Sequence, residues 1–209
     1  MIVGYQLSDL QRETLAEVFN IAMGRAAKAM SNIVNEEVLL SIPQIRMVPR
    51  SEASSLLGGP EQRVYSITQT LDGEFHADAI LILPQARSMD LVRLMLGSPQ
   101  QLELVTELER EALTEIGNII LNACIGTVTN LLEGQFSISL PVLQSGLCGD
   151  IIESHAARQS EEDVVLLLQI DFTVEKHSIN GHLAFVQTVS SFQALLARID
   201  RFIEKAAQG

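Results

Sequence analysis

The chain has 209 residues, 47% of them hydrophobic, and its 26 acidic and 14 basic residues give a formal net charge of −12. This apolar content is enough for a globular core, while the negative charge argues against a nucleic-acid partner. The sequence does not open on a basic segment followed by an apolar one, and no apolar run approaches about 18 residues, so we expect a soluble cytoplasmic protein without a membrane partner.

The first half is predicted to contain a helix, several strands and a second helix. Apolar residues at spacings of three and four indicate a long helix from an N-cap at Ser8 to about Val34. Strands are predicted at VLLSIP, IRMVP, VYSITQTL and ADAILIL, with a turn-rich LLGGPEQ between them and a hairpin turn at residues 72–74. Pro84 suits the first position of a shorter helix, and Gly97 suits its end.

The second half repeats this order of elements. A long helix is predicted from about Thr106 to Glu133, and strands at FSISLPVLQ, VVLLLQIDFTV and HLAFVQTV. A last amphipathic helix is expected from about Ser190 to Ala207. The segment GLCGDIIESHAARQSEED, predicted to form a short helix and a polar loop, is an insertion relative to the first half.

A shift of 98 residues superposes the two halves. SIP at 41–43 then falls on SLP at 139–141. We infer an internal duplication, with repeats at about 8–97 and 106–207. The predicted fold is one α+β domain, with a single antiparallel sheet and two long exposed helices related by a pseudo-two-fold axis. Under the same shift, Leu15, Val18, Ala22, Ala26, Ala29 and Ile33 fall on Leu113, Ile116, Ile120, Cys124, Thr127 and Leu131.

Each long helix carries the pattern Glu-x-x-Asn, as EVFN at 17–20 and EIGN at 115–118. At about 100° per residue, both pairs lie opposite the apolar stripe and face solvent. A single copy of this pattern is usually only a solvated polar face. Asn is a poor residue for a helix interior, however, so its use at the same place in both repeats favours a function.

A proline follows each Asn by 23 residues, at Pro43 and Pro141. Both prolines have an architectural explanation, because an edge strand or a bulge tolerates a residue that has no N–H to donate.

The chemistry available to the two pairs is limited and specific. A neutral amide cannot act as a general base, but Asn20 and Asn118 can orient a water molecule. Such orientation is sufficient for an activated substrate such as an acyl phosphate, since phosphoryl transfer depends mainly on positioning and charge stabilisation. Glu17 or Glu115 would then hold a cation beside the phosphate on a partner.

This pattern resembles the signature of the CheC, CheX and FliY family of response-regulator phosphatases. That signature is Asp or Ser, three residues, Glu, two residues, Asn, twenty-two residues and Pro. The sequence NIAMGRAA after the first Asn is also similar to the family, and two complete copies place the chain nearest to its CheC branch. The matching positions are Glu17, Asn20 and Pro43 in the first copy and Glu115, Asn118 and Pro141 in the second.

The resemblance implies a phosphatase that hydrolyses the aspartyl phosphate of a CheY-like response regulator in chemotaxis. Glu17 or Glu115 would pair with the active-site lysine of the phosphorylated receiver domain. Asn20 or Asn118 would enter the receiver's active site and align the attacking water. Mg²⁺ would belong to the receiver, so the chain would need no metal or cofactor of its own. The resemblance also implies CheD as a regulatory partner.

The sequence departs from the family at three places. Glu13 and Glu111 occupy the position of the family's Asp or Ser, and Phe19 stands where Gly or Ala is usual, as Gly117 does in the second copy. By its helical angle Phe19 lies nearer the packed flank than the exposed stripe, and we expect the second site to be the stronger one. Two alternatives stay open: a non-catalytic module of the same fold that binds a receiver or another chemotaxis protein, and a small-ligand or structural α+β domain.

Overall fold

The computed structural model describes residues 7–34, 36–96, 107–131, 135–155, 163–174 and 177–208. The predicted helix boundaries at Gly97, Thr106 and Glu133 lie outside these ranges. In chain order the elements are α1 (Asp9–Val34), β1 (Val38–Pro49), α2 (Arg50–Leu56), β2 (Arg63–Gly73), β3 (Ala77–Pro84), α3 (Gln85–Leu96), α4 (Glu107–Leu131), β4 (Phe136–Ile138), β5 (Val142–Leu147), α5 (Cys148–Ser154), β6 (Asp163–Val174), β7 (His177–Thr188) and α6 (Val189–Gln208).

The described strands form one seven-stranded antiparallel sheet in the order β1-β6-β7-β3-β2-β4, with β5 also paired to β2. β3 and β7 pair at its centre. Each half places its first strand beside the second strand of the other half, because β1 pairs with β6 while β4 and β5 pair with β2. The single antiparallel sheet is confirmed, and its symmetric strand order is compatible with an internal duplication.

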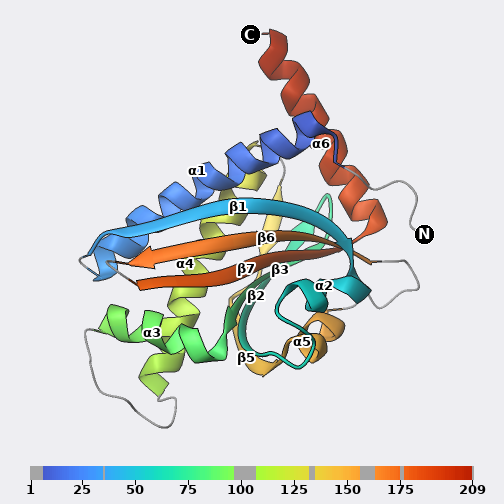
Figure 1. Ribbon diagram of the computed structural model, residues 1–209. Coiled ribbons are helices and arrows are strands. Elements are labelled where there is room, and N and C mark those ends of the chain that lie inside the picture. The colour runs from blue at the N-terminus through green and yellow to red at the C-terminus, as the bar shows by residue number, and fades with distance from the viewer. Residues whose placement is uncertain are drawn as a thin grey trace.

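Helices cover both faces of this sheet. α1, α3, α4 and α6 pack on one face over the larger core, which includes Met23, Ile116 and Phe192. α2 and α5 pack on the other face over a smaller core, which includes Ala53 and Ile151. Figure 1 shows α4 behind the sheet, α2 and α5 in front of it, and the C-terminal end of α6 extending past α1.

α1 begins as the sequence predicts. The backbone N–H of Ser8 donates to Oε1 of Gln11 at 2.9 Å, and the N–H of Gln11 donates to Oγ of Ser8 at 3.2 Å. This capping box satisfies two donors that have no partner inside the helix. The predicted apolar stripe is buried at Ala22, as expected. The prediction was wrong for Ile33, whose side chain is 48% exposed because it lies beyond the buried stretch of α1.

Both prolines lie where an edge strand leaves its ladder. The pairing of β1 with β6 changes register between Ser41 and Gln44, across Pro43. In the second half, the pairing with β2 is interrupted between β4 and β5, across Pro141. A proline has no N–H for a ladder hydrogen bond, so it costs nothing at such an interruption. The architectural explanation of both prolines is confirmed.

A polar cluster attaches the end of α5 to the sheet. Nδ1 of His155 lies 3.0 Å from Oδ2 of Asp78, and Nε2 lies 3.4 Å from Oγ1 of Thr68. Thr70 also donates to Asp78, at 2.7 Å. Burial by itself raises the pKa of Asp78, but the hydrogen bonds from His155 and Thr70 and the charges of His155 and His76 outweigh it and lower that pKa below its ordinary value of 3.8. The cluster therefore supports α5 with a carboxylate that stays ionised.

Candidate functional site

The two Glu-x-x-Asn motifs lie on the outer sides of α1 and α4. Glu17, Asn20 and Glu115 are exposed, and Asn118 is half-exposed. Each helix packs its opposite side against the sheet. The helical projection made from the sequence is therefore confirmed for both motifs, and each carboxylate and amide can reach a partner that approaches from solvent.

Asn20 is held by the interruption of β1. Its Oδ1 accepts a hydrogen bond from the backbone N–H of Ile42 at 3.3 Å. Ile42 directly precedes Pro43, in the segment where β1 changes register, so its N–H lies outside the ladder with β6. This contact joins the Asn to the strand interruption that the proline marks, and it gives the long spacing of the motif a physical reason.

Asn118 is held by a chain of side-chain amides. Nδ2 of Asn122 donates to Oδ1 of Asn118 at 2.7 Å, and Oδ1 of Asn122 accepts from Nε2 of Gln69 at 3.3 Å. Gln69 is only 3% exposed on β2, and the same Nε2 donates to the carbonyl of Ser139 at 3.2 Å. These bonds fix the orientation of the Asn118 amide. A carboxamide oxygen has two lone pairs, so Oδ1 keeps one for a ligand.

The first half lacks the residues for such a chain. Gly24 stands at the position in α1 that corresponds to Asn122, and nothing lies within 4 Å of the place where its Cβ would be. The strand pairing puts Ile170 of β6 where Gln69 stands in β2. The Glu-x-x-Asn motif does not predict a role for Gln69. The sequence feature that could have indicated one is a glutamine on the otherwise apolar face of a predicted strand, between Ile67 and Leu71.

The third residue of each motif lies against the sheet. Gly117 is buried, and a Cβ built on it would lie 2.5 Å from Cγ2 of Ile67. α4 therefore approaches β2 as closely as only glycine permits. Phe19 is 2% exposed and packs in the core, with its ring centre 5.6 Å from that of Phe185 on β7. The prediction that Phe19 lies on the packed flank is confirmed. At the same position of the repeat, α1 places an aromatic side chain against the sheet, whereas α4 has the single hydrogen atom of Gly117.

The substitution Gly117→Ala tests this close approach. The added methyl group overlaps Ile67, so we expect the free energy of unfolding to fall by about 1–3 kcal/mol, measured by urea denaturation. Gly126→Ala is the matched control in the same helix, because nothing lies within 4 Å of its Cβ position. It should be neutral or more stable by up to about 1 kcal/mol. Equal stability of the two variants would contradict the contact between α4 and β2.

Neither cysteine adds a nucleophile to the site. Cys124 and Cys148 are buried and free. Burial raises the pKa of the Cys148 thiol to about 11 and also raises that of Cys124, so both are protonated at neutral pH. Among the described residues, no three His, Cys, Asp or Glu side chains gather as a metal-binding group. The second motif thus offers an exposed carboxylate beside an oriented amide that can place a water molecule.

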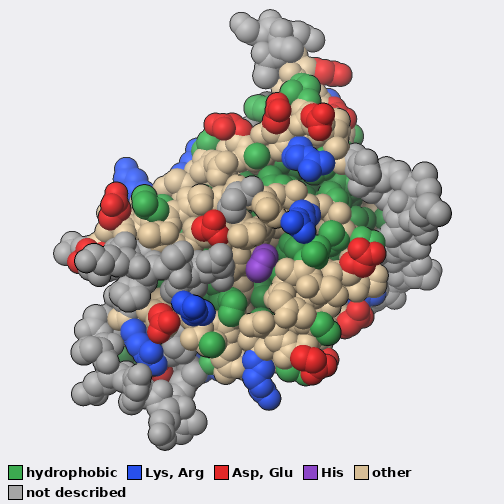
Figure 2. Space-filling view, in the orientation of Figure 1, with side chains coloured by type: hydrophobic (Ala, Val, Ile, Leu, Met, Phe, Trp, Pro, Cys, Tyr) green, Lys and Arg blue, Asp and Glu red, His purple; other side chains and the backbone are tan. Residues whose placement is uncertain are grey.

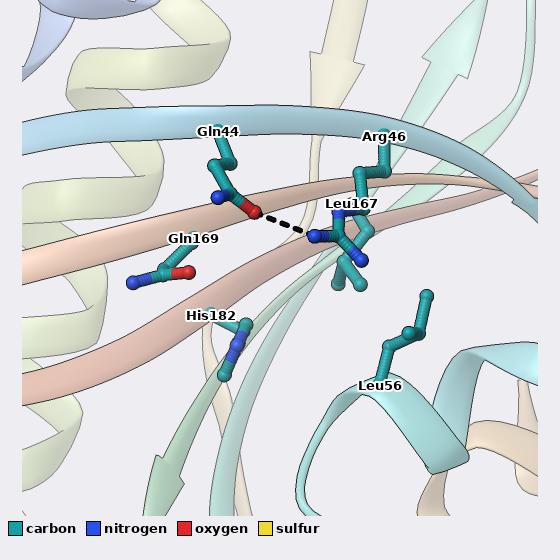
Figure 3. A pocket seen from close by; sticks show the side chains of 6 residues that line it. All are labelled: Gln44, Arg46, Leu56, Leu167, Gln169 and His182. Atoms are coloured by element: carbon teal, nitrogen blue, oxygen red, sulfur yellow. Dashed lines mark hydrogen bonds between the residues drawn. The ribbon is translucent and has the colours of Figure 1, made fainter.

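A polar pocket lies on the other face of the sheet, away from α1 and α4. Its volume is about 90 Å³, well below the roughly 300 Å³ of small-molecule sites. Arg46 donates to Gln44 at 2.8 Å, and burial lowers the pKa of His182 although the charge of Asp171 opposes that shift. On this side of the molecule acidic and basic side chains are interspersed (Figure 2). The pocket is lined by Gln44, Arg46, Leu56, Leu167, Gln169 and His182 (Figure 3).

One helix within the described ranges is long and apolar enough, by length and composition, to cross a membrane. It is the segment Glu107–Asn130 of α4, and 56% of the tested window is buried inside the molecule. The apolar side of α4 packs against the sheet in the larger core.

The curated proteins that match the sequence over most of its length include two from Bacillus subtilis. It is 23% identical to the CheY-P phosphatase CheC of Bacillus subtilis over 199 residues, which are 92% of this chain and 95% of that protein. It is also 23% identical to the flagellar motor switch phosphatase FliY of the same organism, over 81% of this chain and 43% of FliY. No family model matches the sequence.

Solved structures show the same fold. FliY of Thermotoga maritima superposes with a TM-score of 0.75 at 17% identity, over 95% of this chain and 100% of that one. FliM of H. pylori, solved in a complex with SpeE, superposes with a TM-score of 0.69 at 11% identity, over 94% of this chain and 97% of that one. The mixture of helices with one antiparallel sheet is therefore shared by FliY and by FliM.

Proposed function

Because this chain belongs to the CheC, CheX and FliY family and is most like CheC, we propose that it is a chemotaxis phosphatase that hydrolyses the aspartyl phosphate of a CheY-like receiver domain. The match to a protein named CheY-P phosphatase over nearly the full length of both chains supports the reaction. The observation that carries the proposal is the Asn118 amide, fixed at the surface of α4 by Asn122 and Gln69.

Asn118 would align the attacking water. The free lone pair of its Oδ1 accepts one hydrogen of the water, which turns a water lone pair toward phosphorus, in line with the leaving aspartyl oxygen. Attack forms a bond between phosphorus and the water oxygen and breaks the bond between phosphorus and the aspartyl oxygen. The products are a free aspartate carboxylate and inorganic phosphate, which takes up the water oxygen with both of its hydrogens as H₂PO₄⁻. The acyl phosphate is already activated, so positioning by an oriented amide is the main contribution that the reaction needs.

Glu115 would dock the receiver. It is exposed on α4, three residues before Asn118, and two residues at this spacing are neighbours on one helix face. Its carboxylate would pair with the lysine beside the receiver's phosphate, which brings Asn118 to the phosphoryl group. Mg²⁺ would remain a component of the receiver. That this chain needs no metal of its own, and that CheD binds it, both stay predictions.

The second site would contribute most of the activity. Asn118 is oriented through a 2.7 Å hydrogen bond that is itself anchored by a buried glutamine. Asn20 depends on one contact of 3.3 Å to the backbone of β1. Precise orientation of the amide is the catalytic contribution, so the better-held amide should give the faster reaction.

A non-catalytic binding module of the same fold is the second candidate. It is favoured by the likeness to FliM, which was solved in complexes with SpeE and with FliG. Such a module would bind a receiver or another chemotaxis protein and leave the lifetime of the phosphorylated receiver unchanged.

Phosphate release from a phosphorylated receiver distinguishes the two. We expect the wild-type chain to accelerate release, and the double variant Asn20→Ala/Asn118→Ala to return it to the spontaneous rate while still folding, because both side chains lie at the surface. Equal acceleration by the wild type and the double variant would refute the roles of both amides. Binding without any acceleration by the wild type would favour the module.

A further inference from the structure

The chain of amides behind Asn118 ends on a group that can only accept a hydrogen bond. Nε2 of Gln69 donates to the backbone carbonyl of Ser139 at 3.2 Å. An amide side chain can be turned end for end, but a carbonyl oxygen has no hydrogen to donate. Turning Gln69 would place its Oε1 against that carbonyl, and two acceptor oxygens repel each other. The carbonyl of Ser139 therefore fixes which end of Gln69 faces it.

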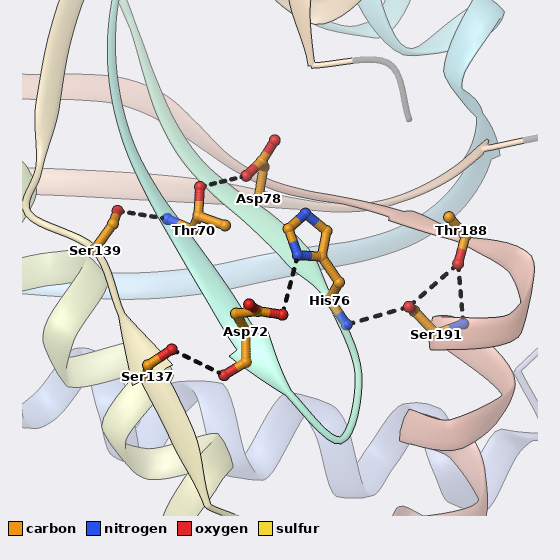
Figure 4. Close-up of polar contacts among 8 residues, drawn as sticks. All are labelled: Thr70, Asp72, His76, Asp78, Ser137, Ser139, Thr188 and Ser191. Atoms are coloured by element: carbon orange, nitrogen blue, oxygen red, sulfur yellow. Dashed lines mark hydrogen bonds and ion pairs between the residues drawn. The ribbon is translucent and has the colours of Figure 1, made fainter. Parts of the chain in front are cut away.

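Ser139 is itself held against β2. Its N–H donates to the carbonyl of Thr70 at 3.0 Å, and the N–H of Thr70 donates to its Oγ at 2.9 Å (Figure 4). Ser139 lies in the interruption between β4 and β5, where the pairing with β2 stops at Ile138 and resumes at Val142. Its carbonyl is thus fixed in place and available to a side chain.

The direction of the chain is transmitted from Gln69 to Asn118. Because Nε2 of Gln69 also donates to Asn122, at 3.3 Å, the atom of Asn122 that faces it must be the acceptor Oδ1. The other end of Asn122, Nδ2, donates to Oδ1 of Asn118 at 2.7 Å. None of the described residues accepts a hydrogen bond from Nδ2 of Asn118, which is half-exposed. The NH₂ group is therefore the end of Asn118 that is left for a ligand.

Asn20 is oriented in the same way by a different contact. Its Oδ1 accepts from the backbone N–H of Ile42 at 3.3 Å, and an N–H can only donate. The NH₂ group is again the end without an acceptor among the described residues, at an exposed position. A backbone N–H in the first half and a backbone carbonyl acting through two amides in the second half thus orient the two asparagines alike.

The packing of the core does not explain Gln69. Its Oε1 is buried and has no partner among the described residues, and such a group destabilises a fold. The first half has Ile170 at the matching position, where it is fully buried and leaves no polar group unpaired. Gln69 is better explained by the chain of amides that it anchors than by the stability of the core.

We propose that Asn122 and Gln69 are positioning residues that turn the NH₂ group of Asn118 toward the phosphoryl group of the receiver. This role rests on the proposed function and deepens it, because phosphoryl oxygens are the acceptors that the NH₂ group would meet there. Negative charge spreads over the three equatorial oxygens in the transition state, and a fixed N–H donor stabilises it. The second lone pair of Asn118 Oδ1 stays available for the attacking water. A reversed amide would direct its own oxygen at these charged oxygens.

The substitution Asn122→Asp tests this orientation, in the full-length chain carrying Asn20→Ala so that only the second site acts. The carboxylate can still accept from Gln69, but it has no hydrogen for Oδ1 of Asn118. The Asn118 amide should therefore turn round and donate from Nδ2. Asn122→Ala removes the contact without imposing an orientation. Asn130→Asp is the matched control, because Asn130 is exposed on the same helix and the change adds the same charge.

The side-chain amide resonances of the ¹⁵N-labelled chain report this orientation without any receiver. In the parent chain the NH₂ hydrogens of Asn118 should exchange rapidly with water. In Asn122→Asp a carboxylate accepts from them, so their resonances should move downfield and their exchange should slow, whereas Asn130→Asp should change neither. Asn118 resonances that are the same in Asn122→Asp and its parent would overturn the proposal, whether or not the chain is a phosphatase.

Phosphate release from a phosphorylated receiver tests the role in the reaction. We expect kcat to fall about tenfold in Asn122→Ala and about 10²-fold in Asn122→Asp, with KM nearly unchanged. Gln69→Met, which removes the donor, should lower kcat about as much as Asn122→Ala, since Asn122 can then turn. All the substituted positions on α4 are exposed, so circular dichroism should show an unchanged fold in those variants.

A merely structural role for Asn122 would make alanine at least as harmful as aspartate, and that order of kcat would overturn the proposal. An equal loss in Asn130→Asp would assign the effect to charge and overturn it as well. Either result would leave the phosphatase assignment intact. If the parent chain releases no phosphate, the proposed function and the role of Asn118 toward the phosphoryl group fail together, while the amide resonances still decide how Asn118 is oriented.

Discussion

Replacing Asn118 with alanine is expected to slow phosphate release from a phosphorylated receiver by about 10²-fold or more at saturating receiver, the loss typical of one preorganised catalytic hydrogen-bonding group. The reason is that the water in the second site loses the amide that orients it. KM should change little, since docking would depend on Glu115. Circular dichroism should show an unchanged fold, because Asn118 is half-exposed on α4.

The control for this prediction is Asn20→Ala in the otherwise unchanged chain. Its effect should be much smaller, because the amide of Asn20 has a single 3.3 Å contact and no amide chain behind it. A larger loss in Asn20→Ala than in Asn118→Ala would contradict the assignment of most activity to the second site.

Removing the charge of Glu115 is the second change with a large expected effect. In an Asn20→Ala background, Glu115→Gln should raise KM for the phosphorylated receiver by about tenfold and lower kcat less, because a charge-assisted contact with the receiver's lysine is lost. The effect should weaken as salt concentration rises, since ions screen exposed charges. Steady-state phosphate release at two ionic strengths measures both the change in KM and its dependence on salt.

Glu111→Gln provides the matched comparison for Glu115→Gln. Glu111 lies on the same helix, is also exposed, and stands one turn before Glu115. Replacing it with Gln lowers the negative charge of α4 by the same amount and leaves the Glu-x-x-Asn pair intact. If the two variants raised KM equally, Glu115 would act only through the general charge of the surface.

Most elements follow from local patterns. The capping box at Ser8 and the spacing of buried residues define α1, and a hairpin connects β2 to β3 as expected. Its turn lies at residues 74–76 and not at 72–74, because Asp72 and Gly73 extend β2 by pairing with β4. The turn in LLGGPEQ is explained by Gly58 and Gly59, which have φ values of 99° and 106°. α2 was not predicted, because Pro49 at its N-cap makes no side-chain cap and the helix buries only Ala53.

The candidate site was predictable where it depends on one helix alone. A period of 3.6 residues suffices to put Glu115 and Asn118 on the exposed side of α4. The contacts that orient the amides could not be predicted, because they depend on how α1 and α4 sit over particular strands. Gln69 precedes Asn122 by 53 residues, and only the register of α4 on β2 brings the two together. The same holds for the contact between Asn20 and Ile42.

The proposed difference between the two sites rests on two matched positions. Gly24 corresponds to Asn122 in the sequence, and Ile170 corresponds to Gln69 in the strand pairing. At both positions only the second half carries an amide, and these two amides form the chain behind Asn118. In the proposed function, the second half would in this way be specialised for the reaction.

The lifetime of the phosphorylated receiver, measured with the chain present at a small fraction of the receiver concentration, tests the phosphatase assignment most directly. We predict that the lifetime shortens, that each chain releases many phosphates, and that Asn20→Ala/Asn118→Ala abolishes the effect. A lifetime that stays at its spontaneous value, even when the chain is raised to an excess that binds all of the receiver, would contradict the assignment.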